Sequence, residues 1–472
     1  MMILLGAVIA GAAEPDLKTL AEALAAPQVA GAVSLAGPLE VGRAKITPRP
    51  GATVYALTAA GLPCGLWVKG PAAFTYRVED RFSQPVAQRN LKSASRLDST
   101  MRDGALVVTA EAEEAVVWGW NLPAGEPVEA APATAFAFSP WARERLERSL
   151  DSNPVRDMLL AHYNGRTDSR HVLLRSGKGD LVVDVDSRPH VLTEWLMRFE
   201  RFGADAGGHA GRLGMVELAA QPIGRSWWEP TPRPYAMTEV GIDVAAGDGP
   251  RARVRSRVRI ESGTDDIRLL ALIVPENLFD EDRRLRPVEL RRVTVGGTPA
   301  ASVRLRSALL VALPNELPAG GSAVVETEME GDFAMRPGKD NYWTMAGAEL
   351  FPMPADGGDL AAQFEIEVEV PAPFVPLASG TTRSRGSADG KERLTSHLDG
   401  PMMTPALIAG KYWTVDAEHD GYKVLVSTYA HPKESEARRL ANNFFATKQC
   451  YENWFGVPHC CPTNSQENTR RA

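Results

Sequence analysis

The stretch RARVRSRVRI, residues Arg251 to Ile260, alternates basic and apolar side chains one residue at a time. This period of two is typical of a β-strand with one face in a hydrophobic core and one face in water. The arginines of one row, Arg253, Arg255, Arg257 and Arg259, would face solvent. The opposite row would face the core and consists of Ala252, Val254, Val258 and Ile260 with Ser256 among them.

Two acidic stretches repeat the same alternation with the opposite charge. FEIEVEV, Phe364–Val370, places Glu365, Glu367 and Glu369 on one face, and VVETEMEG, residues 324–331, does the same with three glutamates. Opposite charges on neighbouring strands stabilise a sheet by roughly 0.2–1 kcal/mol per pair. We therefore expect the arginine strand and the Glu365–Glu369 strand to share a sheet, with their charged faces in water. A phosphate-binding role for the arginine row is the alternative.

The remaining patterns predict a mainly β protein with few short helices. Half-buried antiparallel strands are also predicted at residues 105–120 and 179–187. Helices are predicted at residues 16–26, 139–150, 191–203 and 432–455, the last being the most clearly amphipathic. We expect two consecutive β-sandwich-like domains, followed by a short β-plus-helix start of an incomplete α/β domain.

Six segments are predicted along the chain. The predicted domain boundary is AQPIGRSWWEPTPRPYAM, residues 220–237, whose four prolines oppose regular structure. The predicted segments are a signal-like segment 1–13, an N-terminal mainly β domain 14–212, a Pro-rich linker 213–234, a second β domain 235–418, a strand and helix 419–456, and an unstructured tail 457–472.

Composition restricts the classes of partner. The 472 residues carry a net charge of -7, which disfavours general nucleic-acid binding. The apolar run Ile3–Ala10 leads into Ala10-Gly11-Ala12, which fits a signal cleavage site, so we expect export to a periplasm or the cell exterior; a short buried segment is the alternative. No later stretch is long and apolar enough to span a membrane.

The sequence lacks the usual motifs of catalytic metal sites. None of the eight His is followed by Glu and no two His are four apart, so the HExxH helix of zinc peptidases is absent. Neither a Cys-x-x-Cys pair nor a Gly-x-Ser-x-Gly, Walker or dinucleotide-binding motif occurs. The cysteines, Cys64, Cys450, Cys460 and Cys461, do not form a disulfide framework. We therefore assign no catalytic, cofactor-binding or metal-binding residues.

Two weaker candidates have structural alternatives. DVDSRPH collects Asp184, Asp186 and His190, which suits a metal or acid–base site, but also the polar face of a strand followed by a turn. Trp227, Trp228 and Tyr235 suit a stacking platform for sugars or peptides, but also an aromatic seam between two domains. In both cases we favour the structural interpretation.

From about Tyr235 the order of segments resembles the alanyl-aminopeptidase family of gluzincin zinc metallopeptidases. The resemblance rests on four stretches: residues 253–272, like the family's opening strands; residues 341–381, like its aromatic–Pro segment, strand and Gly turn; PMMTPALIAGKYWTV, residues 401–415, like the strand that closes its saddle-shaped β domain; and residues 421–456, like the first strand and first helix of its thermolysin-like domain. In a complete family member, zinc and a glutamate general base hydrolyse a peptide substrate.

This chain departs from the family at the residues that carry the chemistry. The GAMEN loop and the zinc helix are missing, and no Gln-x-Glu pair aligns; the ENW of residues 452–454 lies inside the predicted helix. We therefore expect a non-catalytic N-terminal portion of an exported aminopeptidase-like metallopeptidase, without zinc. A secreted β-sandwich binding or scaffold module is the alternative.

The end of the chain carries a further expectation. Residues 457–472 differ in composition from what precedes them, which favours a truncated or shifted reading frame; a natural tail is the alternative. If the frame is truncated, the 432–455 helix lacks the domain it packs on, so we expect much of Phe444, Phe445, Tyr451 and Trp454 to lie in water and to favour self-association. The alternative is that the helix folds back imperfectly on the β domain.

Overall fold

The computed structural model divides the chain into two compact units, Met1–Pro232 (unit 1) and Arg233–Ala472 (unit 2). The structure describes residues 15–79, 81, 83–90, 99–123, 125–128, 139–141, 154–165, 170–176, 179–188, 191–199, 212–222, 234–247, 249–263, 266–280, 284–335, 342–345, 350–355, 361–402, 405–419, 422–428 and 434–455. Strands predominate in both units, which confirms the predicted mainly β fold class with few helices.

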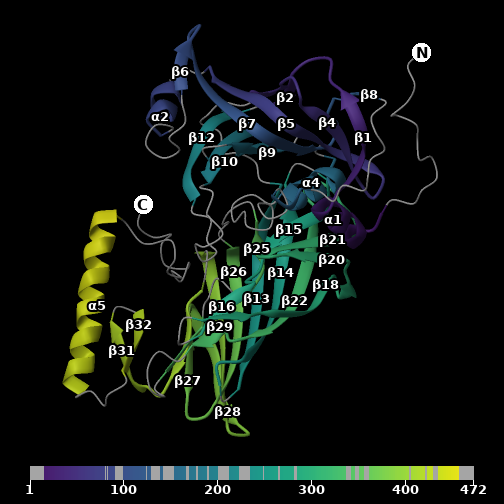
Figure 1. The fold of residues 1–472 in the computed structure, drawn as a ribbon. Helices are drawn as coiled ribbons and strands as arrows, with labels where there is room; N and C mark the ends of the chain where they lie inside the picture. Colours follow the sequence, from purple (N-terminus) through teal and green to yellow (C-terminus); the bar gives the residue numbers. More distant parts are fainter. Residues whose placement is uncertain are drawn as a thin grey trace. The chain divides into compact units, whose positions relative to one another are not determined.

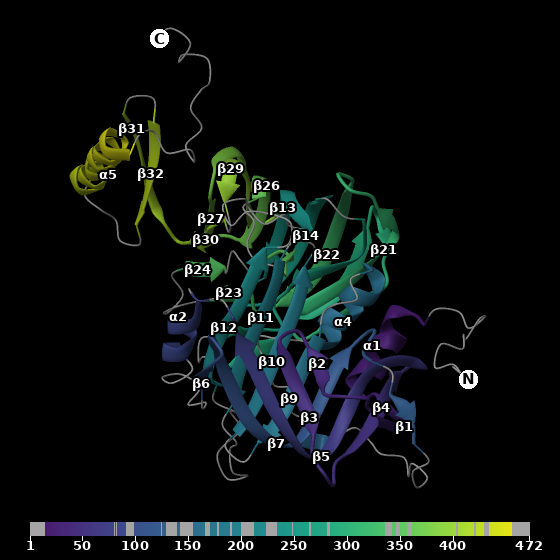
Figure 2. The same cartoon turned by 90° about the horizontal axis from the view of Figure 1, so that it is seen from above.

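Unit 1 is built on one twelve-stranded antiparallel sheet (Figures 1 and 2). Its main path runs β12-β11-β10-β9-β7-β5-β4-β1-β8, with β2, β3 and β6 paired beside it. The strands are β1 (Gln28–Ser34), β2 (Leu39–Val41), β3 (Ala44–Pro48), β4 (Thr53–Ala59), β5 (Leu62–Val78), β6 (Ser99–Arg102), β7 (Ala105–Gly119), β8 (Glu126–Pro127), β9 (Arg170–Ser176), β10 (Gly179–Arg188), β11 (Val191–Phe199) and β12 (Arg212–Pro222).

Three helices complete the described part of unit 1: α1 (Leu17–Ala25), α2 (Ser83–Asn90) and α4 (Pro154–Tyr163). The predicted N-terminal helix is confirmed, and the Asp16 carboxylate caps it by accepting from the backbone N–H groups of Lys18 and Thr19. α1 and α4 contact each other and the sheet, where Trp120 Nε1 donates to the carbonyl of Met158 at 2.7 Å. The predicted helix at 139–150 lies mostly outside the described residues.

Two predictions for this region are wrong. Residues 191–199 form strand β11 instead of a helix, because pairing with β10 on one side and β12 on the other fixes an extended backbone. Arg212–Pro222 form β12, so the predicted linker 213–234 begins inside a strand. A short apolar run does not distinguish helix from strand by itself, and here the available sheet edge decides the outcome.

Unit 2 is a sandwich whose largest layer is an eight-stranded sheet (Figure 1). The strand order is β19-β18-β22-β14-β13-β26-β29-β28, with a parallel pair, β13–β26, at its centre. These strands are β13 (Tyr235–Ala246), β14 (Ala252–Ser262), β18 (Glu289–Val295), β19 (Thr298–Pro299), β22 (Ser322–Gly331), β26 (Ala361–Pro371), β28 (Thr381–Ala388) and β29 (Lys391–Met402).

Smaller sheets cover the apolar face of this large sheet. One has the order β20-β21-β15-β25 and another β23-β24-β30-β27, and residues of both join the core of the large sheet. Their strands, with the β16–β17 hairpin, are β15 (Ile267–Ile273), β16 (Asn277–Phe279), β17 (Leu285–Pro287), β20 (Ser302–Leu305), β21 (Ala308–Leu317), β23 (Ala334–Met335), β24 (Tyr342–Met345), β25 (Met353–Pro354), β27 (Val375–Ala378) and β30 (Leu407–Gly410).

The C-terminal part of unit 2 is a hairpin and one helix. β31 (Trp413–His419) pairs with β32 (Tyr422–Thr428), and α5 (Glu434–Phe455) contacts both strands. The predicted boundary at residues 418–419 therefore falls inside β31. None of the described helices combines the length and apolar composition that crossing a bilayer requires.

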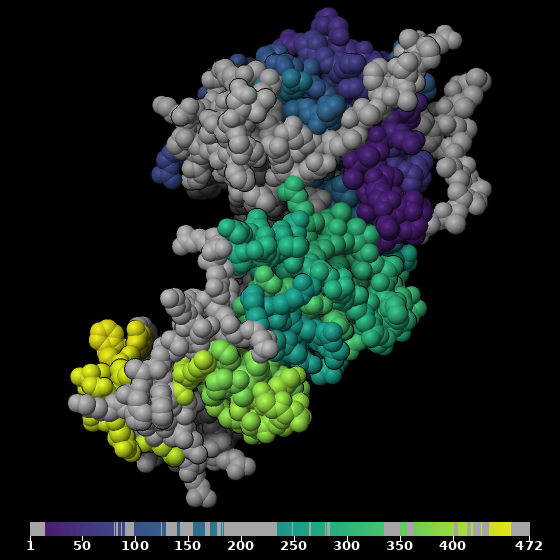
Figure 3. Space-filling view, turned by 60° about the horizontal axis from the view of Figure 1, so that its bottom comes forward, coloured from purple at the N-terminus to yellow at the C-terminus, as the bar shows by residue number. Residues whose placement is uncertain are grey.

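Helix α5 uses one side of its apolar surface to pack on the hairpin. Ala437, Ala441 and Phe445, spaced four apart, are buried. Phe444 and Trp454 are instead 53% and 78% exposed, and Leu440 and Tyr451 are also exposed. Figure 3 shows side chains of α5 (yellow) at the molecular surface. The predicted exposure is thus confirmed for Phe444, Tyr451 and Trp454 and wrong for Phe445.

Tyr235 joins the large sheet to the smaller sheet through one buried hydroxyl. That hydroxyl donates to the carbonyl of Ala271 at 2.5 Å and accepts from the Ala271 N–H at 3.1 Å. Tyr235 therefore belongs to the core of unit 2.

We expect Tyr235→Phe to lower the free energy of unfolding of unit 2 by roughly 1–3 kcal/mol, because it removes the hydroxyl partner of a buried backbone amide. Urea denaturation measures this, and an unchanged unfolding midpoint would contradict it.

Candidate functional site

The outward face of the eight-stranded sheet carries rows of charged side chains of both signs. We call it the charged face: the outward side chains of β18, β22, β14, β13, β26 and β29. The arginine strand β14 and the glutamate strand β26 both belong to this sheet, separated by β13, which confirms their predicted placement. The arginines Arg253, Arg255 and Arg257 are exposed, and Ser256 on the opposite row is buried, where its hydroxyl bonds that of Thr327 at 2.6 Å.

Strand register arranges the charged face into cross-strand rows. Each residue of a row lies directly opposite its neighbour on the next strand. One row reads Arg292, Glu328, Arg255, Asp243, Glu367 and Thr395 from β18 to β29; the next reads Thr294, Glu326, Arg257, Gly241, Glu365 and His397.

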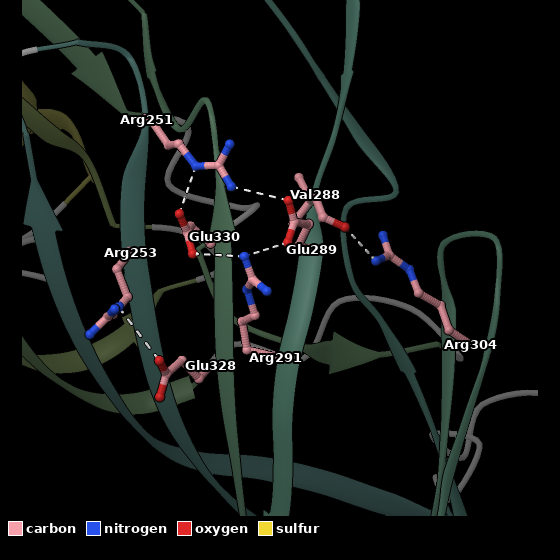
Figure 4. Close-up of polar contacts among 8 residues, drawn as sticks. All are labelled: Arg251, Arg253, Val288, Glu289, Arg291, Arg304, Glu328 and Glu330. Carbon is pink, nitrogen blue, oxygen red and sulfur yellow. Dashed lines mark hydrogen bonds and ion pairs between the residues drawn. The ribbon is translucent and has the colours of Figure 1, made fainter.

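One end of the charged face is held by a closed ring of four charges (Figure 4). Arg251 contacts Glu330 at 2.6 Å and Glu289 at 3.0 Å, and Arg291 contacts the same two carboxylates at 3.2 Å and 2.5 Å. The hydrogen bond from Arg251 is the main cause that lowers the pKa of Glu330 below its usual value. Since each group already has two partners of opposite charge, this ring is structural.

The part of the charged face on β26 and β29 is also paired. Glu369 accepts from Lys391 and, at 2.8 Å, from Arg393, and the Lys391 hydrogen bond is the main cause that lowers the pKa of Glu369. His397 lies between two carboxylates, with Nδ1 2.8 Å from Glu365 and Nε2 2.8 Å from Asp399. Because both ring nitrogens are engaged, this histidine has no free position for a metal or for proton transfer to a substrate.

A half-buried arginine beside the ring forms hydrogen bonds to the backbone of neighbouring segments. The guanidinium of Arg304 donates to the backbone carbonyls of Val288 at 2.7 Å and Arg306 at 3.1 Å, and also to that of Pro275. Figure 4 shows the contact with Val288. Burial is the main cause that lowers the pKa of Arg304. Its role is to join three backbone segments.

Over the two rows described above the charged face is hollowed. A concavity of about 510 Å³ lies over the middle of β13, β14 and β22. Gly241 and Ile242 contribute to its floor, and its charged lining consists of Arg255, Arg257 and Arg292 with Asp243, Glu326, Glu328, Glu365 and Glu367. This concavity is the candidate binding site of unit 2.

The structure describes only two of the three sequence candidates for a metal or acid–base site. Asp184 and Asp186 both lie on β10, where Asp184 is opposite His171 of β9. His190 lies outside the described residues. Within the described ranges, no group of three or more His, Cys, Asp or Glu is arranged to hold a metal ion. Of the predicted aromatic cluster, Tyr235 is a core residue, and Trp227 and Trp228 lie outside the described residues.

The cysteines of the described part differ in accessibility. Cys64 is fully buried, and burial raises the pKa of its thiol to about 12, so it is not a nucleophile at neutral pH. Cys450 is exposed on α5, and both are free thiols. Cys460 and Cys461 lie outside the described residues.

Sequence reasoning missed Gly241, His397 and Arg304. A glycine inside a strand pattern marks a close approach or a gap, and this signal was available for Gly241 in TEVGIDVAA. The other two depend on contacts between residues far apart in the chain: the carboxylate of Glu365 is 32 residues from His397, and the carbonyl of Pro275 is 29 residues from Arg304.

The comparisons with known proteins give a fold-level likeness at most. No family model matches the sequence, and no curated protein matches it. Solved structures that the fold is similar to include an M1 zinc metallopeptidase from Deinococcus radiodurans (16% identity, TM-score 0.36) and a mutant of it bound to a Tyr-Ser-Ala substrate (17% identity, TM-score 0.37). Each alignment covers 48% of this chain and 55% of the other, so the chain spans about half the length of these structures.

The paired carboxylates predict how stability depends on pH. Because the pKa values of Glu330 and Glu369 in the folded state lie below the ordinary 4.5, their pairs stabilise the fold above that pH. This stabilisation is lost as pH falls through the lowered values. We expect Glu330→Gln/Glu369→Gln to lower the thermal midpoint at neutral pH and to flatten its fall below about pH 4.5.

Thermal melts of unit 2 between neutral and acidic pH measure this difference. High salt is the control, because it screens exposed pairs and should reduce the gap between the two proteins. Parallel pH profiles for both proteins would contradict the assignment.

Proposed function

We propose that this chain is the non-catalytic N-terminal portion of an exported, aminopeptidase-like zinc metallopeptidase. In this proposal unit 2 has the role of the saddle-like β domain, and β31, β32 and α5 are the start of an α/β catalytic domain. The observation that carries the proposal is the order of elements in unit 2. A large sandwich is followed by a separate hairpin and an amphipathic helix, in the same order as the four stretches on which the sequence resemblance rests.

The packing of α5 supports this proposal. The helix contacts β31 and β32, which pair only with each other among the described strands. Its second apolar row includes Leu440 and Phe444, each about half exposed. Apolar side chains of this size stabilise by about 1.5–3 kcal/mol each when they become fully buried. A β-plus-helix piece with such a surface suits the edge of a larger α/β domain, which would cover it.

The residues of this chain do not fit the zinc that the family would hold. The HExxH pair of ligands is absent from the sequence, and the described residues contain no metal-ligand cluster. We therefore assign no hydrolytic step, no catalytic residue and no cofactor to this chain. Peptide substrates would belong to a complete family member.

A secreted β-sandwich binding or scaffold module is the second candidate. The observation that favours it is the concavity of about 510 Å³ on the charged face, which is distant along the chain from the hairpin and α5. In this candidate the chain binds a partner without chemistry.

The non-catalytic proposal predicts a metal-free, inactive protein. The purified chain, dialysed against zinc and then against buffer, should retain no stoichiometric zinc and should not hydrolyse aminoacyl p-nitroanilides. Metal analysis and the absorbance of released nitroaniline measure this. One zinc per chain together with hydrolysis that a chelator abolishes would overturn the proposal.

Hydrogen exchange separates the two candidates. As the start of a larger domain, α5 should exchange faster at Leu440–Trp454 than strand β26 does at Phe364–Val370, because helices without full tertiary packing open readily. Mass spectrometry of dilute monomer measures both segments. Equal, slow exchange would favour the self-sufficient binding module.

A further inference from the structure

The middle of the charged face contains a gap where a side chain is expected. Gly241 lies near the centre of β13, between Arg257 of β14 and Glu365 of β26. Glycine weakens a strand interior, so its presence calls for a reason. Its backbone φ is not positive, and the three atoms nearest to an added Cβ are side-chain atoms of Arg257, each at the ordinary contact distance of 3.7 Å. Neither backbone conformation nor packing within the chain therefore requires glycine here.

The Arg257 side chain lies over this gap with its donors unused. Its Nε and Nη2 atoms are both 3.7 Å from the position of a Cβ on Gly241, so the guanidinium covers the glycine. Among the described residues, no hydrogen bond or ion pair of Arg257 is formed. Its cross-strand neighbour Glu326 instead accepts from Thr294 at 2.6 Å, and Glu365 pairs with Arg383 and His397. A planar guanidinium with free donors suits a carboxylate.

The neighbouring cross-strand row contains two carboxylates that likewise lack a partner among the described residues. Asp243 lies directly opposite Glu367, on the neighbouring parallel strand, and both are exposed. Within the described part of the chain, neither forms an ion pair. Arg255, which is opposite Asp243 on its other side, has its Nε 3.4 Å from Glu328. Two adjacent carboxylates without a cation suit an ammonium or guanidinium group.

The balance of charge selects the class of ligand. Three arginines and five carboxylates line the concavity, which leaves an excess of two negative charges. That excess disfavours a simple anion such as phosphate, while the unused donors of Arg257 would remain unused with a simple cation. A ligand with one acidic and one basic group would pair with Arg257 through the first and with Asp243 and Glu367 through the second.

The spacing selects an extended peptide. Gly241 and Asp243 are two residues apart on β13, so the Arg257 end and the Asp243–Glu367 end are separated by about 7 Å. In an extended peptide, side chains i and i+2 point to the same side with the same separation. We propose that the concavity over Gly241 binds an extended peptide segment with an acidic and a basic residue two positions apart, the acidic side chain on Arg257 and the basic one on Asp243 and Glu367. This proposal does not depend on the proposed function.

Binding of a short peptide tests the proposal. The probe is the acetylated, amidated pentapeptide Thr-Glu-Val-Lys-Thr, titrated at low salt and followed by saturation-transfer NMR on the full chain. We expect saturable binding that weakens with salt, because the contacts are exposed ion pairs. A peptide with Gln in place of both charged residues should not bind.

Variants locate the binding site. Gly241→Leu fills the gap and should weaken binding by about tenfold or more, which corresponds to about 1.4 kcal/mol. Arg257→Gln and Glu367→Gln should each weaken it as well. Gly386→Leu is the matched control, because Gly386 lies in a strand of the same sheet with no atom near its added Cβ, and Arg259→Gln controls for loss of an arginine from the same strand.

Four results would overturn the proposal. The first three are equal binding of the neutral peptide, undiminished binding by Gly241→Leu with a native thermal melt, and equal binding of a peptide that keeps only its Lys. The third would indicate a site for cations alone. Equal loss of binding in the Gly386→Leu control would likewise show that the concavity is not the site.

Discussion

Burial of one row of side chains on the inner strands of the eight-stranded sheet is the constraint on which unit 2 depends. The apolar rows of β13, β14, β22 and β26 form one continuous core with the two smaller sheets. Because side chains alternate between faces, a shift of one residue in any strand would bring charged side chains into this core. The register is therefore fixed, and with it the position of every charge on the outer face.

The charged face follows from that register. Arginines of β14 and glutamates of β22 lie opposite each other, so most charges on this face have partners of opposite sign. Individual exposed ion pairs contribute little to the free energy of folding. The closed ring around Arg251 and Glu330 differs from them because each of its groups has two partners. In this setting Arg257, Asp243 and Glu367 lack partners among the described residues, and they lie together around Gly241.

The helix α5 has a different relation to its surroundings. Its buried row of Ala437, Ala441 and Phe445 lies on a two-stranded hairpin, which offers too little surface to cover the rest of the helix. Small side chains in this row allow close packing, while the larger Leu440 and Phe444 stay exposed. An apolar helix surface of this size is commonly an interaction site, either with another part of a larger domain or with another protein.

Local sequence patterns determined the strands β14, β22 and β26 with their charged rows, and the capped helix at Leu17–Ala25, because these depend on residues within one or two turns or pleats of each other. Tertiary structure decided the rest. Residues 191–199 became a strand because two neighbouring strands were available to pair with, and Arg212–Pro222 extended that sheet. The site around Gly241 exists only because β14, β13 and β26 are neighbours, and the parallel pairing of β13 with β26, more than a hundred residues later, is a long-range choice that periodicity does not encode. Alternation in the sequence determines on which side of the sheet a side chain lies. Only the order of the strands determines which side chains become its neighbours.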